Sequence, residues 1–141
     1  MATLSLPVSG GEILMIPLLV SQQVTVDIAG GAGPTWVAPF KGRVLGAVGI
    51  CGLQGGTPHT DIDLTIQNAN NSDANMLTGV IPVVNASVIV RDTNVVVGPS
   101  TVAGAAAFSV LDNIELVVDI TGGTTPTAEC VGAYLLVQRE P

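Results

Sequence analysis

The chain has 141 residues, of which 48% are hydrophobic and only 11% are charged, and its formal net charge is −7. This length fits a single domain with ample apolar material for a core. The four Lys and Arg residues do not form the clustered basic patch that nucleic acid or an anionic membrane surface requires. We therefore exclude both as partners.

The scarcity of charge also predicts that the protein does not work as a lone molecule. A typical soluble domain has about 25% charged residues, more than twice the fraction in this chain. We expect other protein to cover much of the surface, in a homo-oligomer, on a larger assembly, or both.

Residues 1–12 are expected to form a flexible N-terminal arm, and residues 13–141 a single β-sandwich domain. The arm contains no Lys or Arg, so no secretory signal is expected. The apolar segment Ile13–Val20 is too short to cross a membrane and predicts a strand instead. Pro17 within it favours an edge or terminal position, because proline cannot donate a backbone hydrogen bond.

Three segments alternate apolar and polar residues with a period of two, which predicts half-buried strands. They are Gln23–Ile28, Asp61–Gln67 and Asn113–Thr121. In the last of these, we expect the apolar side chains to point inward, and Glu115 and Asp119 to point to solvent.

Further strands are expected over Phe40–Cys51, Leu77–Val84, Ser87–Val97 and Glu129–Gln138. The first contains three glycines, which leave space for a close neighbour or a bend. The last is apolar on both faces, which predicts a central position or an interface. Val102–Leu111 is the one segment where a short helix could form.

About eight strands separated by turn signals, with no long helix, predict an all-β fold: an antiparallel β-sandwich or jelly roll preceded by the arm. Natural sheets often protect their edges with Lys or Pro. Segments 77–97 and 129–138 contain no Lys. If they form sheet edges, we expect another subunit to cover them.

Side chains suited to catalysis are few. His59, the single histidine, lies in a turn, and the nucleophile motif G-x-S-x-G is absent. Asp61 and Asp63 share a strand face and could help to bind Ca²⁺, although any solvent-facing strand alternates in this way. We expect no catalytic residue, no bound metal and no cofactor.

Cysteine and aromatic residues have simple structural interpretations. Cys51 and Cys130 lie in apolar stretches and are expected to be buried thiols, with a disulfide between them as the alternative. The four aromatic residues are scattered along the sequence: Trp36, Phe40, Phe108 and Tyr134. Sugar-binding and single-strand-binding sites usually need aromatic platforms, so we do not expect one.

Several features together resemble the decoration, or cement, proteins of tailed-phage heads. They are a short apolar N-terminal arm, the segment Pro39-Phe40-Lys41-Gly42-Arg43-Val44 that leads to the alternating strand Asp61–Gln67, an Asn-rich loop, the late strand Asn113–Ile120 and the apolar final strand Val131–Val137. The resemblance covers about residues 35–140, and trimeric fibre and spike domains share the same pattern.

The resemblance implies a jelly-roll-like virion protein that is assembled in the host cytoplasm. It would bind as a homotrimer to the major capsid protein on the outer surface of an icosahedral head and stabilise the shell. It implies no catalytic residues and does not indicate the trimer interface. The N-terminal segment of this family often contacts the shell, which here maps onto Leu4, Leu6, Ile13, Leu14, Ile16 and Leu18.

Two other functions remain as alternatives. The first is a trimeric head-fibre or tail-spike module that binds host glycans, which would need a groove with clustered aromatic side chains. The second is a Ca²⁺-dependent β-sandwich binding module or enzyme that uses Asp61, Asp63 and Asp119.

Overall fold

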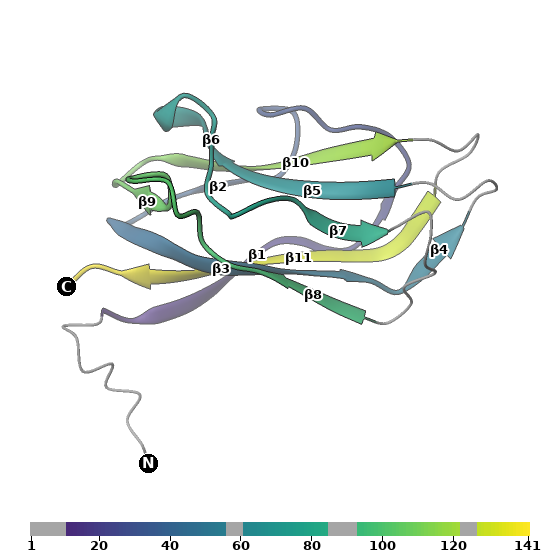
Figure 1. Ribbon diagram of the computed structural model, residues 1–141, viewed down its shortest axis with the longest axis horizontal. Helices are drawn as coiled ribbons and strands as arrows, with labels where there is room; N and C mark the ends of the chain where they lie inside the picture. The colour runs from purple at the N-terminus through teal and green to yellow at the C-terminus, as the bar shows by residue number, and fades with distance from the viewer. Residues whose placement is uncertain (1–10, 56–60, 85–92, 122–126) are drawn as a thin grey trace, which may run out of the picture.

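The computed structural model describes residues 11–55, 61–84, 93–121 and 127–141, which form two antiparallel sheets packed face to face (Figure 1). The strands are β1 (Ile13–Val24), β2 (Thr35–Val37), β3 (Gly42–Cys51), β4 (Leu53–Gly55), β5 (Asp61–Asn68), β6 (Ala74–Asn75), β7 (Ile81–Val84), β8 (Thr93–Val97), β9 (Ala107–Phe108), β10 (Asn113–Thr121) and β11 (Thr127–Arg139). A 3-10 turn, η1 (Ala69–Asn71), follows β5.

Eight of these strands build the two sheets. Sheet A has the order β1-β11-β3-β8, and in sheet B β10 lies between β2 and β5, whose other edge pairs with β7. Among the eight, the first therefore pairs with the last, the second with the seventh, the third with the sixth and the fourth with the fifth. This is the pairing of a chain folded in half and rolled up, a jelly roll. The expected all-β sandwich is confirmed, and β4, β6 and β9 are additional strands of two or three residues.

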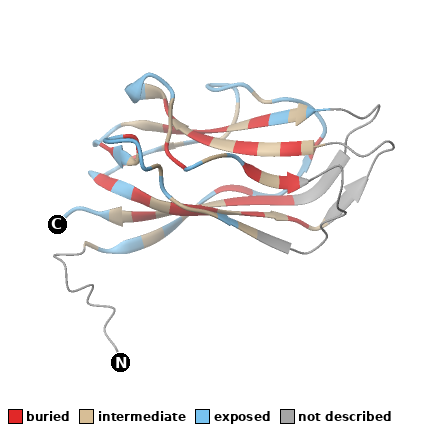
Figure 2. Cartoon of the chain, viewed as in Figure 1, coloured by how far each residue is buried: buried red, intermediate tan, exposed pale blue. Residues whose placement is uncertain are grey.

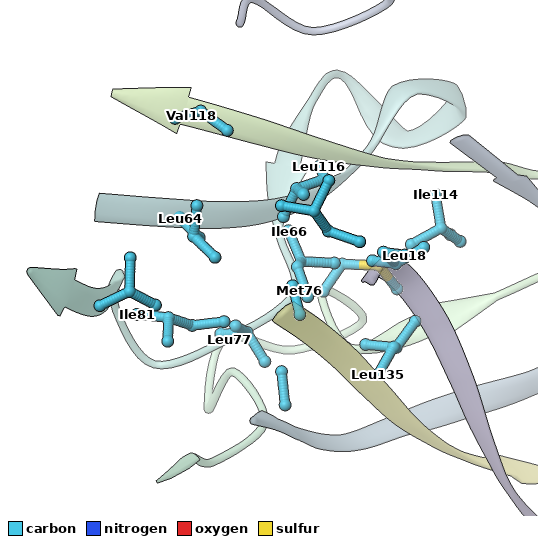
Figure 3. Packing of buried hydrophobic residues seen from close by; sticks show 14 of the residues in the cluster. Leu18, Leu64, Ile66, Met76, Leu77, Ile81, Ile114, Leu116, Val118 and Leu135 are labelled. Carbon is cyan, nitrogen blue, oxygen red and sulfur yellow. The ribbon is translucent and has the colours of Figure 1, made fainter. Parts of the chain in front are cut away.

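The core lies between the inner faces of the two sheets. Along β5, buried and partly exposed residues alternate, with Ile62, Leu64 and Ile66 completely buried (Figure 2). Side chains of β10 and β11, such as Leu116 and Leu135, face the same interior (Figure 3). The period of two expected for Asp61–Gln67 is confirmed because only one face of β5 meets the opposite sheet.

Gly49 on β3 allows the two sheets to approach closely. A Cβ atom at this position would lie 2.4 Å from Cγ2 of Ile81 and 2.7 Å from Cγ1 of Val83, both on β7. The side chains of β7 thus occupy the space that a larger residue on β3 would need. The expected use of glycine in this strand to admit a close neighbour is confirmed at this position.

We predict that Gly49→Ala destabilises the fold by about 1–3 kcal/mol, because the added methyl group overpacks the core. Gly79→Ala is the matched control, since a Cβ there meets nothing within 4 Å. We expect the control to stay within about 0.5 kcal/mol of the native chain. Urea unfolding followed by circular dichroism measures both free energies, and equal stability of the two variants would contradict the packing argument.

The strand expected over Gln23–Ile28 is wrong in its bounds. β1 continues from the predicted strand at Ile13 as far as Val24, with three register shifts against β11 after Pro17. Beyond Val24 the chain crosses to sheet B, where Ile28 forms an isolated bridge with Val118. Val26 is exposed rather than turned toward the core. The alternation was misleading because the chain leaves sheet A after Val24 and crosses to sheet B, and sequence periodicity does not reveal such a change of sheet.

The short helix considered for Val102–Leu111 is also wrong. This segment forms turns and the two-residue strand β9, which pairs with β3 at Gly42 and Arg43. The N–H of Val44 donates to the carbonyl of Ala106 at 2.8 Å, so the segment is tied to the edge of sheet A. Pairing with β3 outweighs the local helix preference of the alanines.

The final strand is central, as its apolar composition predicted. β11 pairs with β1 on one edge and with β3 on the other. Segment 129–138 therefore forms no sheet edge, and the condition for expecting a subunit to cover it is not met. β1 forms the edge beside it, and Pro17 together with the bulges makes that edge irregular.

Candidate functional site

The outer face of sheet A is apolar across its four main strands. The pleat that turns Val44 and Leu135 inward directs the alternate side chains of the same strands outward. We call this surface the apolar face; it consists of Ile13, Met15, Pro17, Leu45, Val48, Ile50, Val96, Tyr134 and Leu136. Its large aliphatic side chains include Met15, which is 60% exposed, and Val96, which is 72% exposed.

Strand register brings these side chains into rows. Pro17 lies opposite Tyr134, Tyr134 opposite Val48, and Val48 opposite Val96, so one apolar row crosses all four strands. Arg43 and Gln138 are also neighbours in register at one end of the face, where Arg43 Nε donates to Gln138 Oε1 at 3.1 Å. The described residues of this face include no carboxylate. The surface is suited to protein contact because apolar area gains free energy when it is removed from water.

The outer face of sheet B has the opposite character. We call it the acidic face; β5 contributes Asp61, Asp63, Thr65 and Gln67, and β10 contributes Glu115, Val117, Asp119 and Thr121. Asp63 and Asp119 lie directly opposite each other in the register. Burial raises the pKa of Asp63 above its ordinary value of 3.8, and the negative charges of Asp61 and Asp119 raise this pKa further.

The sequence suggested Asp61, Asp63 and Asp119 as a possible Ca²⁺ site. Register places Asp63 next to Asp119 and two positions from Asp61 on the same face. Within the described ranges, however, no group of three His, Cys, Asp or Glu side chains is arranged to hold a metal ion. What the geometry does show is repulsion between carboxylates that lie side by side on a sheet.

We predict that Asp63→Asn stabilises the protein at neutral pH by about 0.2–1 kcal/mol, because it removes a like-charge pair across two strands. The pKa of the Asp63 carboxyl is higher in the fold than in the unfolded chain, where it is about 3.8. The protonated carboxyl therefore favours folding at low pH, and this contribution is lost as the pH rises through the folded pKa. The advantage of Asp63→Asn should therefore be present at pH 7 and disappear below about pH 3.8.

Thermal melts at pH 7 and at pH 3.5 measure this dependence. Asp73→Asn serves as the control because it removes the same charge from an exposed turn, where Asn tolerates the positive φ of 56°. A gain of the same size in Asp73→Asn would show that net charge matters, rather than the pairing of Asp63 with its neighbours.

Glu115 was expected to point into solvent, but it is buried. Its Oε2 accepts a hydrogen bond from Gln67 Nε2 at 3.2 Å. The loop at Gly30 covers this pair, and a Cβ there would lie 2.4 Å from Gln67 Nε2 and 2.9 Å from Glu115 Oε2. The expectation was wrong because a glycine loop distant in sequence lies over the outer face of β10.

Three of the four aromatic residues gather at one end of the sandwich, although they are scattered in the sequence. The ring centroids of Trp36 and Phe108 are 5.4 Å apart, and Phe40 lies 5.7 Å from Trp36 and 6.0 Å from Phe108. Arg139 Cζ lies 5.5 Å from the centroid of Phe40. Because Phe108 is buried and the other two rings pack against the core, this cluster closes the sandwich and is not an exposed platform.

A buried polar group lies beside this cluster. Asn68 Nδ2 donates to Asp112 Oδ2 at 2.8 Å, and Asn68 Oδ1 accepts from the N–H of Asn70 at 3.0 Å. Asp112 Oδ2 also accepts from the N–H of Ser109 at 2.9 Å. These bonds fasten the turn after β5 to the turn before β10, so Asn68 has a structural role.

The turn before β10 carries exposed apolar side chains. Leu111 has a φ of 70°, which L-residues rarely adopt, and its side chain is 69% exposed. Its N–H donates to the carbonyl of Ala38 at 2.7 Å, which holds the turn beside Val37. Val37 and Val110 are exposed as well. This turn combines backbone strain with apolar exposure.

We predict that Leu111→Asn raises the free energy of unfolding by about 0.5–1 kcal/mol, because Asn tolerates the left-handed conformation and little burial is lost. Val110→Asn is the control at a neighbouring exposed position, and we expect it to change stability by less than about 0.5 kcal/mol. Chemical denaturation of both variants tests this, and a destabilised Leu111→Asn would mean that the leucine side chain contributes contacts to the fold.

The resemblance assigned capsid contact to six residues: Leu4, Leu6, Ile13, Leu14, Ile16 and Leu18. The first two lie outside the described residues. Leu18 belongs to the buried core, and Leu14 and Ile16 pack against that core from β1. Ile13 is exposed on the apolar face. Contact with a capsid stays a prediction for this set, and Ile13 is the described member whose side chain faces outward.

The other singled-out residues are placed as follows. Cys51 is buried in the core, whereas the side chain of Cys130 lies outside the described part of the structure, so their pairing stays open. His59 also lies outside the described residues. No helix in the described ranges has the length and apolar character needed to span a bilayer.

Comparisons with known proteins add no relative: no protein-family model, no curated protein and no solved structure matches this chain.

Proposed function

We propose that this protein is a structural virion protein, a decoration or cement protein that binds as a homotrimer to the outer surface of an icosahedral phage head. Its partners would be further copies of itself and the major capsid protein, and it would be assembled in the host cytoplasm. The observation that carries the proposal is the contrast between the apolar face of sheet A and the acidic face of sheet B. Such a molecule has one side suited to protein and one suited to water.

The apolar face supports a role in assembly. A surface crossed by a row of Pro17, Tyr134, Val48 and Val96 gains free energy when protein covers it. Removal of apolar area from water contributes about 25 cal/mol per Å². A decoration protein repeats its contacts, between copies and with the shell, many times over one head, so modest contacts add up to a large stabilisation of the whole head.

The acidic face supports an outward orientation. Asp63, Asp119 and Asp61 repel one another, and this repulsion is weakest when water and counterions screen them. A decoration protein that keeps this face in contact with solvent would give the particle a negatively charged exterior. That charge would limit adhesion between particles.

The jelly roll is compatible with this role but does not single it out. Capsid, lectin and enzyme domains share the architecture, so the function must be argued from surfaces. Trp36, Phe40 and Phe108 close the end of the sandwich, and the described part of the chain offers no aromatic groove for the alternative of glycan binding. The contrast between the two faces therefore favours the decoration role.

Binding to phage heads tests the proposal. The purified chain is mixed with empty heads that lack it, prepared from the phage that encodes it, and bound protein is measured by co-sedimentation. We expect saturable binding in multiples of three copies, density on the outside of the shell by electron microscopy, and a raised temperature of head disruption. Binding should be unaffected by DNA.

The control uses the same chain after heat unfolding, which should not bind the heads in a saturable way. A native chain that shows no affinity for the heads would contradict the proposal. So would density inside the shell rather than on its surface.

A further inference from the structure

We infer that the apolar face of sheet A is the surface through which copies of this chain pack against one another. This inference takes the number of copies, three, from the proposed function and rests on it in that respect. It adds what the proposed function leaves open, namely which part of the molecule forms the contact between subunits.

The shape and composition of the face fit protein as the covering partner. Met15 and Val96 lie at opposite edges of sheet A and are strongly exposed, with the side chains of β11 and β3 between them. Along β3, the outward residues Leu45, Val48 and Ile50 are partly exposed, while Val44 and Ala47 on the inner side are buried. An apolar sheet surface of this kind resembles one half of a β-sandwich core.

The distribution of charge argues that the covering partner is another copy of this chain. The net charge of −7 makes copies repel one another unless their acidic groups stay apart. Four of the described carboxylates, those of Asp61, Asp63, Glu115 and Asp119, lie on the outer face of sheet B. Glu140, which follows β11 in sheet A, is neutralised by an ion pair with Lys41 Nζ at 3.0 Å. Copies whose sheets A face a common axis turn these groups outward and keep both sheets of each copy between them and that axis, whereas contact through sheet B would bring them together.

The size of the face is sufficient for a stable contact. The ten residues of β3 at about 3.3 Å each span roughly 33 Å, the five residues of β8 span roughly 17 Å, and neighbouring strands lie about 4.8 Å apart. The face therefore measures on the order of 600 Å², the upper end of the apolar patches that single-chain proteins expose. It approaches the roughly 800 Å² that each partner contributes to a standard interface.

Other exposed apolar groups fit this role less well. Val37, Val110 and Leu111 lie around a single turn, and Asp112 follows them directly in the sequence. Val102 is 69% exposed in the turn region before β9, away from the pleated surface of sheet A. These groups form no row across neighbouring strands, so they supply matched control positions.

The test places a carboxylate in the proposed contact. Met15→Glu and Val96→Glu alter two strongly exposed side chains of the face, so neither change removes buried core. Val102→Glu makes the same chemical change at an equally exposed position outside the face. Sedimentation velocity over a range of concentrations gives the mass of each variant, and circular dichroism melts confirm that each is folded.

We expect the native chain and Val102→Glu to form trimers, and Met15→Glu and Val96→Glu to form monomers at the same micromolar concentration. The dissociation constant should rise by about a hundredfold or more, since an unpaired charge is costly inside an apolar contact. Trimers that persist in both face variants would overturn the inference. Dissociation of Val102→Glu to the same extent would overturn it as well.

The two proposals fail separately. If the face variants stay trimeric and the native chain binds heads, the decoration role stands and the contact between copies lies elsewhere. If the native chain is monomeric at all concentrations yet binds heads, the inference is wrong and the decoration role survives without the trimer. If trimers dissociate as expected but no chain binds heads, the inference stands and the proposed function fails.

Discussion

Antiparallel pairing of β11 with β1 along one edge and with β3 along the other is the interaction on which sheet A depends. β1 has no other hydrogen-bonded neighbour in the described sheet, so within sheet A it is held by β11, while Leu18 and Leu19 anchor it to the core. The inner side chains of β11, including Leu135 and Val137, are fully buried against sheet B. The same strand turns Tyr134 and Leu136 outward onto the apolar face. One apolar segment thus serves both the core and the outer surface.

This arrangement divides the molecule into two sides with different solvent preferences. On sheet B, alternation of apolar and acidic residues along β5 separates core from water within a single strand. On sheet A, β3 and β11 are apolar on both faces except at one end, where Arg43 and Gln138 face outward. A sheet that is apolar on both faces normally has a layer of structure on each. The described chain supplies one of these layers, and assembly supplies the other in the function proposed above.

The elements that sequence reasoning identified correctly are those fixed by local periodicity. Asp61–Gln67 alternates without interruption, and β5 follows it almost residue for residue because one face meets the core. β11 was expected to be central because its composition is apolar on both sides. Pro17 indicated an edge strand because it cannot donate to a ladder, and β1 is that edge.

The features that sequence reasoning missed depend on contacts between distant segments. The bulges of β1 and the crossing of the chain near Ile28 to Val118 have no periodic signal. Glu115 looked exposed because the loop that covers it, at Gly30, lies 85 positions earlier in the sequence. Trp36 and Phe108 looked scattered because only the folded topology brings β2 and β9 to the same end. The apolar face could be anticipated only in part, since its rows depend on strand register as well as composition.

The folded-back topology has a consequence for synthesis on the ribosome. β1 emerges early, but its partner β11 is the last of the strands to be made, and Ile13 pairs with Gln138. Pairing between segments so far apart is slow to form, and a nascent chain that lacks β11 leaves apolar strands without neighbours. Sheet A cannot close during elongation, so this domain must fold after translation has passed Arg139. Until then, β1 and β3 lack the strand with which both of them pair.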